Sequence, residues 1–176
     1  MERLLALDHR IARAMSGHRL PTVLTPAVRA ASHLGLFPLH LGLWAAAGWS
    51  VGFTPPLRAA LAGAVGVRVL CFVVKAATRR ARPFEAVDGV SRVGGRPPDT
   101  SFPSSHTAQV VYSAVALRAV AAPAGVPFVP PWPSLAVVVL VVAYARMRLG
   151  VHFLSDVLAG AALAALAALA VRAAIG

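Results

Sequence analysis

The chain has 176 residues, of which 58% are hydrophobic and only 13% are charged. Ordinary globular domains carry roughly 25% charged residues, so this composition excludes a typical soluble domain. It predicts a single integral-membrane domain over residues 1–176. The formal net charge of +11 is high enough for a nucleic-acid partner. The basic residues flank apolar segments without interleaved aromatic residues, however, so we expect no nucleic-acid binding.

The N-terminal segment, residues 1–30, has an amphipathic pattern. Charged residues interrupt every apolar run near the start, so it does not read as a cleavable signal sequence. From Glu2 to Arg19, leucines and other apolar residues recur at helical spacing against arginines. The pattern predicts a helix that lies in the membrane interface, and a helix packed against the side of a bundle is an equal alternative.

Five apolar segments follow that are candidates to cross a bilayer as helices. They cover approximately residues 36–53, 57–74, 104–122, 135–145 with a polar extension to 148, and 151–175. The predicted fold is all-α: a polytopic transmembrane helical bundle of about five spanning helices, preceded by the amphipathic helix. Arg68 lies inside the second span, where a charge either faces the bundle interior or extends to the interface. The small residues of the last span favour close helix packing.

Three short polar segments interrupt the apolar chain, at residues 75–83, 103–106 and 146–156. The first ends the second span, the second opens the third span, and the third joins the fourth and fifth spans. Successive crossings alternate in direction, so all three segments are predicted on one side of the membrane. The hydrophilic stretch 84–102 lies on that side too, as a candidate lid or headgroup-reading loop.

The first polar segment contains Lys75 and Arg82, seven residues apart. On a continuous helix they would share one face and bind one anion, with Pro83 ending the helix. Cations at the end of a span are, taken alone, typical of anchors that reach the lipid headgroups. We interpret Arg79 and Arg80 as such anchors.

The second segment places Ser104 directly before an apolar run, where serine is a favoured helix N-cap. Capping alone is one interpretation. A helix N-terminus also presents unpaired backbone N–H groups that bind phosphate oxygens. His106, in the first turn, is then placed to give a proton to a leaving oxygen.

The third segment contains His152 and Asp156, which would share a face of a helix because they are four residues apart. The carboxylate can then accept from one imidazole N–H and leave the other nitrogen free to attack. A His–Asp pair that only ties helices together is the alternative. Arg146 has a planar guanidinium suited to two oxygens of the same phosphate.

These segments, K-x6-R-P, P-S-x-H and R-x5-H-x3-D, resemble in order and spacing the three-part signature of the type 2 phosphatidic acid phosphatase superfamily. The resemblance implies a membrane lipid phosphate phosphatase that uses no metal ion and no cofactor. His152 would be the nucleophile that forms a phosphohistidine, Asp156 its orienting partner and His106 the general acid.

The resemblance also assigns the phosphate-binding groups. They would be Lys75, Arg82, Ser104, Ser105 with its neighbouring backbone amides, and Arg146. Two positions depart from the family pattern, because Ser105 stands where glycine is common and Ala145 where serine is common. Neither change alters the implied nucleophile, its partner or the acid.

Arginines are more numerous on the predicted active-site side, even after Arg68 and the implied site residues are set aside. Ten lie on that side, against Arg58, Arg118 and Arg172 on the other: Arg3, Arg10, Arg13, Arg19, Arg29, Arg79, Arg80, Arg92, Arg96 and Arg148. This bias predicts an active site on the cytoplasmic face of a bacterial plasma membrane.

The expected substrate is a phosphate monoester or diphosphate of a glycerolipid or polyprenyl lipid in the bilayer, including a polyprenyl-phosphoryl sugar phosphate such as decaprenylphosphoryl-5-phosphoribose. Three alternatives stay open: an outward-facing undecaprenyl or decaprenyl diphosphate phosphatase, a soluble acid phosphatase or haloperoxidase with the same phosphate site, and a non-enzymatic protein that binds lipid headgroups. The sequence makes no prediction of oligomeric state.

Overall fold

A computed structural model describes residues 2–17 and 21–175 of the chain. Within these residues all regular structure is helical, and no strand is present, which confirms the all-α prediction. The elements are α1 (Glu2–Gly17), η1 (Thr22–Leu24), α2 (Thr25–His33), α3 (Phe37–Val51), α4 (Pro55–Thr78), α5 (Pro83–Ala86), α6 (Ser105–Ala116), η2 (Leu117–Ala121), α7 (Trp132–Arg148) and α8 (Leu154–Ala174).

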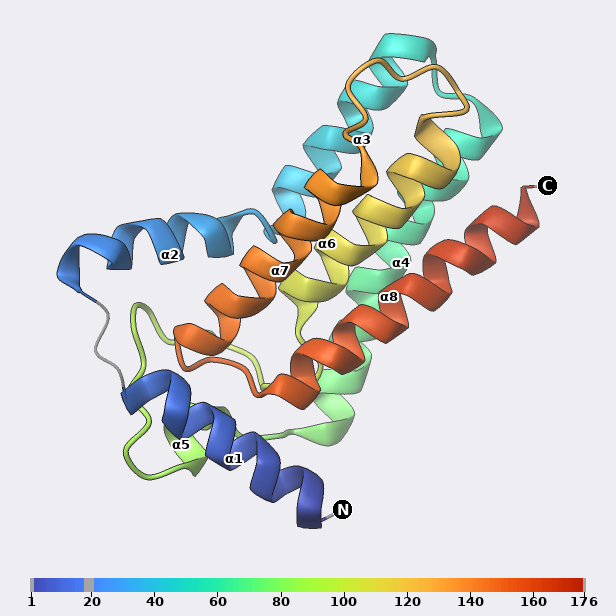
Figure 1. Ribbon diagram of the computed structural model, residues 1–176. Coiled ribbons are helices and arrows are strands. Elements are labelled where there is room, and N and C mark those ends of the chain that lie inside the picture. Colours follow the sequence, from blue (N-terminus) through green and yellow to red (C-terminus); the bar gives the residue numbers. More distant parts are fainter. Residues whose placement is uncertain (1, 18–20, 176) are drawn as a thin grey trace.

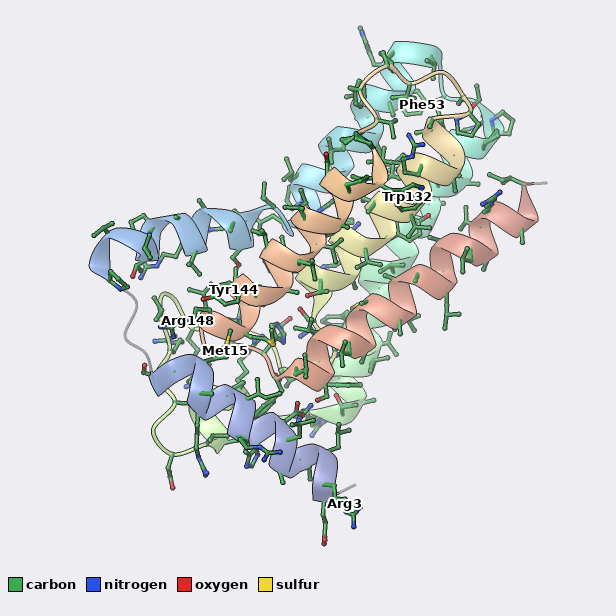
Figure 2. All side chains as sticks on the ribbon, viewed as in Figure 1. Arg3, Met15, Phe53, Trp132, Tyr144 and Arg148 are labelled. Atoms are coloured by element: carbon green, nitrogen blue, oxygen red, sulfur yellow. The ribbon has the colours of Figure 1, made fainter. Side chains whose placement is uncertain are left out.

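The longer helices α3, α4, α6, α7 and α8 run side by side as a bundle (Figure 1). Helix α1 lies across the end at which α4 and α7 stop and α6 and α8 begin, and α2 packs against α7. Trp44, Leu57 and Tyr112 are among the large side chains buried in the bundle core. Figure 2 places Phe53 and Trp132 toward the opposite end from Arg3 and Arg148.

Two stretches, residues 55–86 and Leu154–Ala174, are long and apolar enough to cross a membrane. Helices α2 and α3 together form a third candidate, bent by 50° at the break between them. The outward faces expose large apolar side chains such as Phe72, Leu140 and Leu166, as expected for a surface in contact with lipid. Helices α3, α6 and α7 have 15, 12 and 17 residues and are shorter than these two stretches. That the chain crosses the membrane five times therefore stays a prediction.

The N-terminal helix packs against the end of the bundle. Asp8 and Ala12 are buried, and the His9 ring stacks on Phe153 with centroids 5.7 Å apart. Leu4 and Leu5 remain exposed and free to contact a bilayer. Of the two alternatives for this segment, packing on the bundle is therefore realised. The predicted helix end at Arg19, and the position of that arginine, lie outside the described residues.

Helix α8 approaches α6 closely through small residues, as the sequence predicts. Gly160, Ala164 and Ala168 are buried on its inner face. A Cβ atom added at Gly160 would lie 2.5 Å from the Ser104 carbonyl oxygen, so only glycine fits there without a shift of the backbone. This contact sets the first turn of α6 against the beginning of α8.

Candidate active site

The three polar segments meet at one end of the bundle. The Ser104 amide donates to the Asp156 carbonyl oxygen at 2.9 Å, the Ser101 amide to the Arg80 carbonyl at 2.9 Å, and the Phe84 amide to the Gly150 carbonyl at 3.3 Å. All eight predicted site residues lie in this region: seven are buried and His106 is half-buried. Their catalytic and binding roles remain predictions.

Lys75 and Arg82 converge, but not on one helix face. The condition for a shared face, a helix that continues from Lys75 to Arg82, is not met, because α4 ends at Thr78 and Arg79 adopts a left-handed conformation with φ of 47°. The chain turns there and brings Arg82 back beside Lys75. Both cations then meet Asp99, whose carboxylate lies 3.5 Å from Lys75 Nζ and 2.6 Å from Arg82 Nη2.

The loop before α6 holds these two cations firmly. Arg82 donates to the Asp99 carbonyl at 3.0 Å, the Thr100 carbonyl at 3.2 Å and the Val151 carbonyl at 2.6 Å, besides the Asp99 carboxylate. A guanidinium has five N–H donors, so one remains for a ligand. Lys75 donates to the Thr100 carbonyl. The predicted lid segment therefore also supports the cations.

Ser104 is the N-cap of α6, which confirms that prediction. Its Oγ accepts from the Thr107 amide at 3.4 Å and lies 3.0 Å from the Thr107 hydroxyl. Ser105 Oγ is buried and has no hydrogen-bond partner among the described residues. His106 follows in the first turn.

His152 and Asp156 meet at the start of α8 rather than on one helix face. The prediction of a shared face is wrong, because His152 precedes the helix, which begins at Leu154. Asp156 turns back over the first turn, and its Oδ2 accepts from the Phe153 amide at 2.8 Å. His152 Nδ1 lies 3.5 Å from that oxygen and has no hydrogen-bond partner in the described part of the chain. The pair is in contact without a hydrogen bond.

His152 is a neutral imidazole in this setting. It is almost fully buried, and burial disfavours its charged form. The neighbouring cations Arg146, Arg82 and Lys75 act in the same direction, so the pKa of His152 is well below its usual range. A neutral ring keeps a lone pair for attack on phosphorus.

Arg80 holds the Asp156 carboxylate, contrary to its interpretation as an anchor. Its Nη1 lies 2.7 Å from Asp156 Oδ1, and its Nη2 lies 2.8 Å from Asp8 Oδ2 on α1. Its guanidinium carbon stands 4.3 Å from the centroid of the Phe153 ring. The Ser101 hydroxyl donates to Asp156 Oδ2, and the Ser155 hydroxyl to Asp8. This network joins the amphipathic helix to the His–Asp pair.

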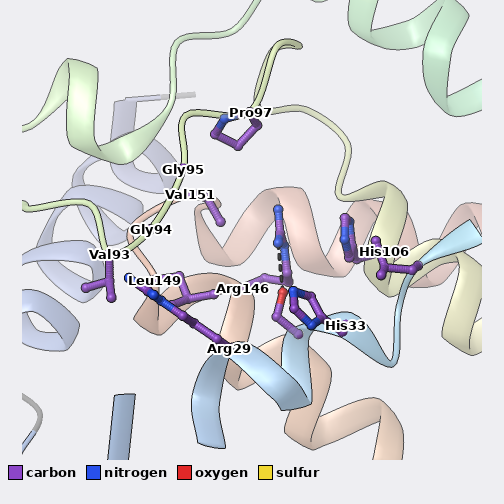
Figure 3. A pocket seen from close by; sticks show the side chains of 12 residues that line it. Arg29, His33, Val93, Gly94, Gly95, Pro97, His106, Arg146, Leu149 and Val151 are labelled. Atoms are coloured by element: carbon purple, nitrogen blue, oxygen red, sulfur yellow. Dashed lines mark hydrogen bonds between the residues drawn. The ribbon is translucent and has the colours of Figure 1, made fainter. Parts of the chain in front are cut away.

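A cavity of about 430 Å³ opens beside His106 and Arg146 (Figure 3). Arg146 donates to Ser32 Oγ on α2 at 2.8 Å, and its Nε has no partner among the described residues. Arg29 and His33 of α2 add polar groups that the motif search missed. The wall also includes Gly94, Gly95 and Pro97 of the loop, whereas Lys75, Arg82 and His152 lie outside it.

The carboxylates at this end of the bundle are paired with cations, as Asp8 and Asp156 are with Arg80 and Asp99 is with Lys75 and Arg82. In residues 2–17 and 21–175, no three His, Cys, Asp or Glu side chains group as a metal site. The polar lining of the cavity consists of two arginines, two histidines and a serine, with no carboxylate: Arg29, Arg146, His33, His106 and Ser32. A membrane-embedded bundle with a buried His–Asp pair, a helix N-terminus and converging cations defines an integral-membrane enzyme of phosphate ester chemistry.

Comparison with known proteins agrees with this class. Residues 56–176 match the family model of the PAP2 superfamily, and the chain belongs to that superfamily. A decaprenylphosphoryl-5-phosphoribose phosphatase of Mycolicibacterium smegmatis is 34% identical over 146 residues, which cover 80% of this chain and 72% of that protein. The resemblance predicted from the three motifs is confirmed, and the protein is a membrane lipid phosphatase.

Two solved structures share the fold. The transmembrane PAP2-type phosphatidylglycerolphosphate phosphatase of Bacillus subtilis superposes with a TM-score of 0.80 at 24% identity, over 99% of this chain and 87% of that chain. LpxE of Aquifex aeolicus superposes with a TM-score of 0.72 at 21% identity, over 94% of each chain. At these identities the likeness concerns the arrangement of the helices.

Proposed function

We propose that this protein hydrolyses the phosphate ester of a membrane lipid through a phosphohistidine at His152. The observation that carries the proposal is a buried His152 with Nδ1 3.5 Å from Asp156 Oδ2, surrounded by Arg146, Arg82 and Lys75. Asp156 orients the ring, and Nε2 is the attacking nitrogen because Nδ1 faces the carboxylate.

The reaction takes two displacements at phosphorus. In the first, His152 Nε2 forms a P–N bond as the bond from phosphorus to the leaving oxygen breaks, and His106 gives that oxygen a proton. In the second, His106 takes a proton from water, which attacks phosphorus and breaks the P–N bond to release inorganic phosphate. The lipid alcohol or shortened lipid phosphate and free phosphate are the products.

The cations stabilise charge on the phosphoryl oxygens in both steps, and the reaction needs no metal ion. Arg146 faces the cavity and has unpaired N–H donors. Ser104, Ser105 and the first amides of α6 contribute further donors. Lys75 and Arg82 become fully available when the phosphoryl group takes the place of the Asp99 carboxylate.

The substrate we propose is a polyprenyl-phosphoryl pentose phosphate. The 34% identical relative, named for decaprenylphosphoryl-5-phosphoribose, supports this choice over a glycerolipid phosphate. The arginine bias of the sequence supports a site on the cytoplasmic face of a bacterial plasma membrane. An outward-facing site would favour a polyprenyl diphosphate instead.

Purified protein in detergent, tested on a panel of lipid phosphates with the His152→Ala variant, examines reaction and substrate together. We expect phosphate release by the wild-type protein, an acid-labile phosphoenzyme on rapid quenching, and neither with the variant. Full turnover by His152→Ala rejects the mechanism. Loss of activity on chelator treatment, restored by a divalent metal, rejects the metal-free site.

The membrane face has its own experiment. Gly95→Cys places a thiol on the exposed rim of the cavity, while the native Cys71 is buried. An impermeant thiol reagent applied to intact cells should leave Gly95→Cys unmodified and react with it after the membrane is opened. Modification in intact cells reverses the assignment of the face.

A further inference from the structure

A second, smaller cavity of about 100 Å³ also has His106 in its wall. It is formed where the start of α3 meets the first turns of α6 and the exposed Arg68 of α4. Its lining consists of Gly35, Leu36, Phe37, Pro38, Arg68, Ser105, His106 and Gln109. At roughly 30 Å³ per water molecule, it has space for about three waters, which is the scale of one phosphoryl group.

Polar groups without partners face this cavity. Gln109 is only 1% exposed, and neither its amide nitrogen nor its amide oxygen has a hydrogen-bond partner in the described residues. Ser105 Oγ likewise has no hydrogen-bond partner in the described residues. A buried amide left unpaired is costly, so the Gln109 amide nitrogen and the Ser105 hydroxyl favour an occupant that accepts hydrogen bonds, with water left to pair the amide oxygen.

The charge of the cavity favours an anion. Arg68 precedes Lys75 by seven residues on α4, so both lie on nearly the same face, about 10 Å apart along the axis. None of the eight lining residues is acidic. Across residues 2–17 and 21–175, no carboxylate forms an ion pair with Arg68. The Arg68 side chain is exposed, but it lines the cavity, and ionisable groups of membrane helices that face a cavity mark functional sites.

His106 connects the two cavities, because its side chain lines both. In the proposed reaction His106 protonates the leaving oxygen, so the leaving group lies beside His106 and within reach of the smaller cavity. An anion bound there belongs to the part of the substrate that departs with that oxygen.

We propose that Arg68 and Gln109 bind a second phosphoryl group, one carried by the leaving group of the lipid substrate. The inference rests on the proposed function and narrows its substrates to lipids with two phosphoryl groups. Both a lipid diphosphate and a prenyl-phosphoryl sugar phosphate have this chemistry, whereas phosphatidic acid has a neutral leaving group. Arg68 supplies the charge and the Gln109 amide a hydrogen bond.

The experiment compares two substrates that differ by one phosphoryl group, farnesyl phosphate and farnesyl diphosphate. For Arg68→Gln we expect kcat/KM on the diphosphate to fall ~10-fold or more, as for one lost charge-assisted hydrogen bond, with the monophosphate within about 2-fold of wild type. Gln109→Leu should show the same selective loss to a smaller extent. Arg58→Gln, which removes an exposed arginine from the other end of α4, is the matched control.

A third substrate, a short prenyl-phosphoryl pentose 5-phosphate, distinguishes an adjacent phosphoryl group from one separated by a sugar. If kcat/KM of the two variants falls on this compound alone, the cavity binds the phosphodiester that links the prenyl chain to the sugar. Equal losses on every substrate, or unchanged discrimination in both variants, overturn the proposal and leave the cavity to water. In those cases an inactive His152→Ala variant still supports the phosphohistidine mechanism, so the two failures are distinguishable.

Discussion

Arg80 Nη1 lies 2.7 Å from Asp156 Oδ1, and the other terminal nitrogen of the same guanidinium lies 2.8 Å from Asp8 Oδ2. Both carboxylates are buried, and they come from opposite ends of the chain. One arginine therefore compensates the carboxylate that faces His152 and the carboxylate that fixes the N-terminal helix.

Replacing Arg80 by Gln should lower both stability and turnover. Removal of one partner from a buried ion pair costs about 3 kcal/mol, because the remaining charge is left uncompensated. A displaced Asp156 should cost kcat ~100-fold through misorientation of His152, with little change in KM. Thermal unfolding in detergent and steady-state kinetics measure the two effects.

Arg79→Gln is the matched control for this change. Arg79 is exposed, and its Nε donates only to the Ala76 carbonyl of its own helix, at 3.3 Å. Its replacement should change stability by no more than about 0.5 kcal/mol and leave kcat unchanged. Equal effects at the two positions would show that the Arg80 contact with Asp156 has no special role.

Asp8→Asn tests whether the amphipathic helix supports the active site. The substitution removes the charge that pairs with Arg80 and weakens the contacts with Ser155. We expect the losses of unfolding free energy for Asp8→Asn and Arg80→Gln to be non-additive by about 1–3 kcal/mol in a double-mutant cycle. Glu2→Gln, an exposed change on the same helix, should be neutral, and additive losses would exclude coupling.

The acidic limb of the pH–rate profile should lie below pH ~6.5, the ordinary pKa of imidazole. Burial and the cations around His152 lower its pKa, so the nucleophile stays neutral as the pH falls through this range. By the same linkage, the fold loses stability as the pH drops below ~6.5, because the unfolded chain binds the proton more tightly.

Arg146→Gln removes the largest of these cationic influences on His152. The pKa of His152 should rise, and the acidic limb of kcat/KM should move to higher pH. Arg29 lines the same cavity but is not among the cations that lower the pKa of His152. The acidic limb of kcat/KM for Arg29→Gln should therefore lie at the same pH as in the wild-type protein. An unmoved limb in Arg146→Gln would assign that limb to another group.

Asp99→Asn should strengthen inhibition by inorganic phosphate. The Asp99 carboxylate lies 3.5 Å from Lys75 Nζ and 2.6 Å from Arg82 Nη2, so a bound phosphate competes with it for both cations. Without that charge the inhibition constant should fall ~5-fold, equivalent to about 1 kcal/mol. Asp88→Asn, at an exposed position of the same loop, should leave it unchanged, and weaker inhibition in Asp99→Asn contradicts the competition.

Gly160→Ala should disturb the site through the backbone of α6. The added Cβ would lie 2.5 Å from the Ser104 carbonyl oxygen, and forced overpacking of this kind costs about 1–3 kcal/mol. Activity should fall with stability because Ser104 moves. A Cβ at Gly66 meets nothing within 4 Å, so Gly66→Ala should be neutral or slightly stabilising in the same assays.

The sequence predicts the helical bundle and the meeting of the three segments because hydropathy and crossing parity are properties of the chain alone. It also places Lys75 beside Arg82, but through a shared helix face, whereas in the structure a left-handed turn at Arg79 brings them together. No glycine in the sequence indicates that turn. The helix start after His152 was missed because Asp156 folds back to cap the Phe153 amide.

The contact of Arg80 with Asp8 joins residues 72 positions apart and leaves no local pattern. Both residues match ordinary surface roles, an anchor in a basic run and an acid on an amphipathic helix. Gln109 lies among apolar neighbours of α6, where only its missing partners single it out. The roles of such residues can be recognised only from the three-dimensional arrangement of the helices.

The directions of α4 and α7 have an electrostatic consequence. The carbonyl ends of α4 and α7 point toward the region where the phosphate is proposed to bind, and the partial negative charge of a helix C-terminus repels an anion. Lys75 lies in the last turn of α4, and Arg146 and Arg148 lie in the last turn of α7. These side chains offset the helix dipoles even without substrate. Neutralising Lys75 or Arg146 should therefore weaken the fold as well as the proposed phosphate binding, so a substitution at either position should not gain stability at the expense of activity.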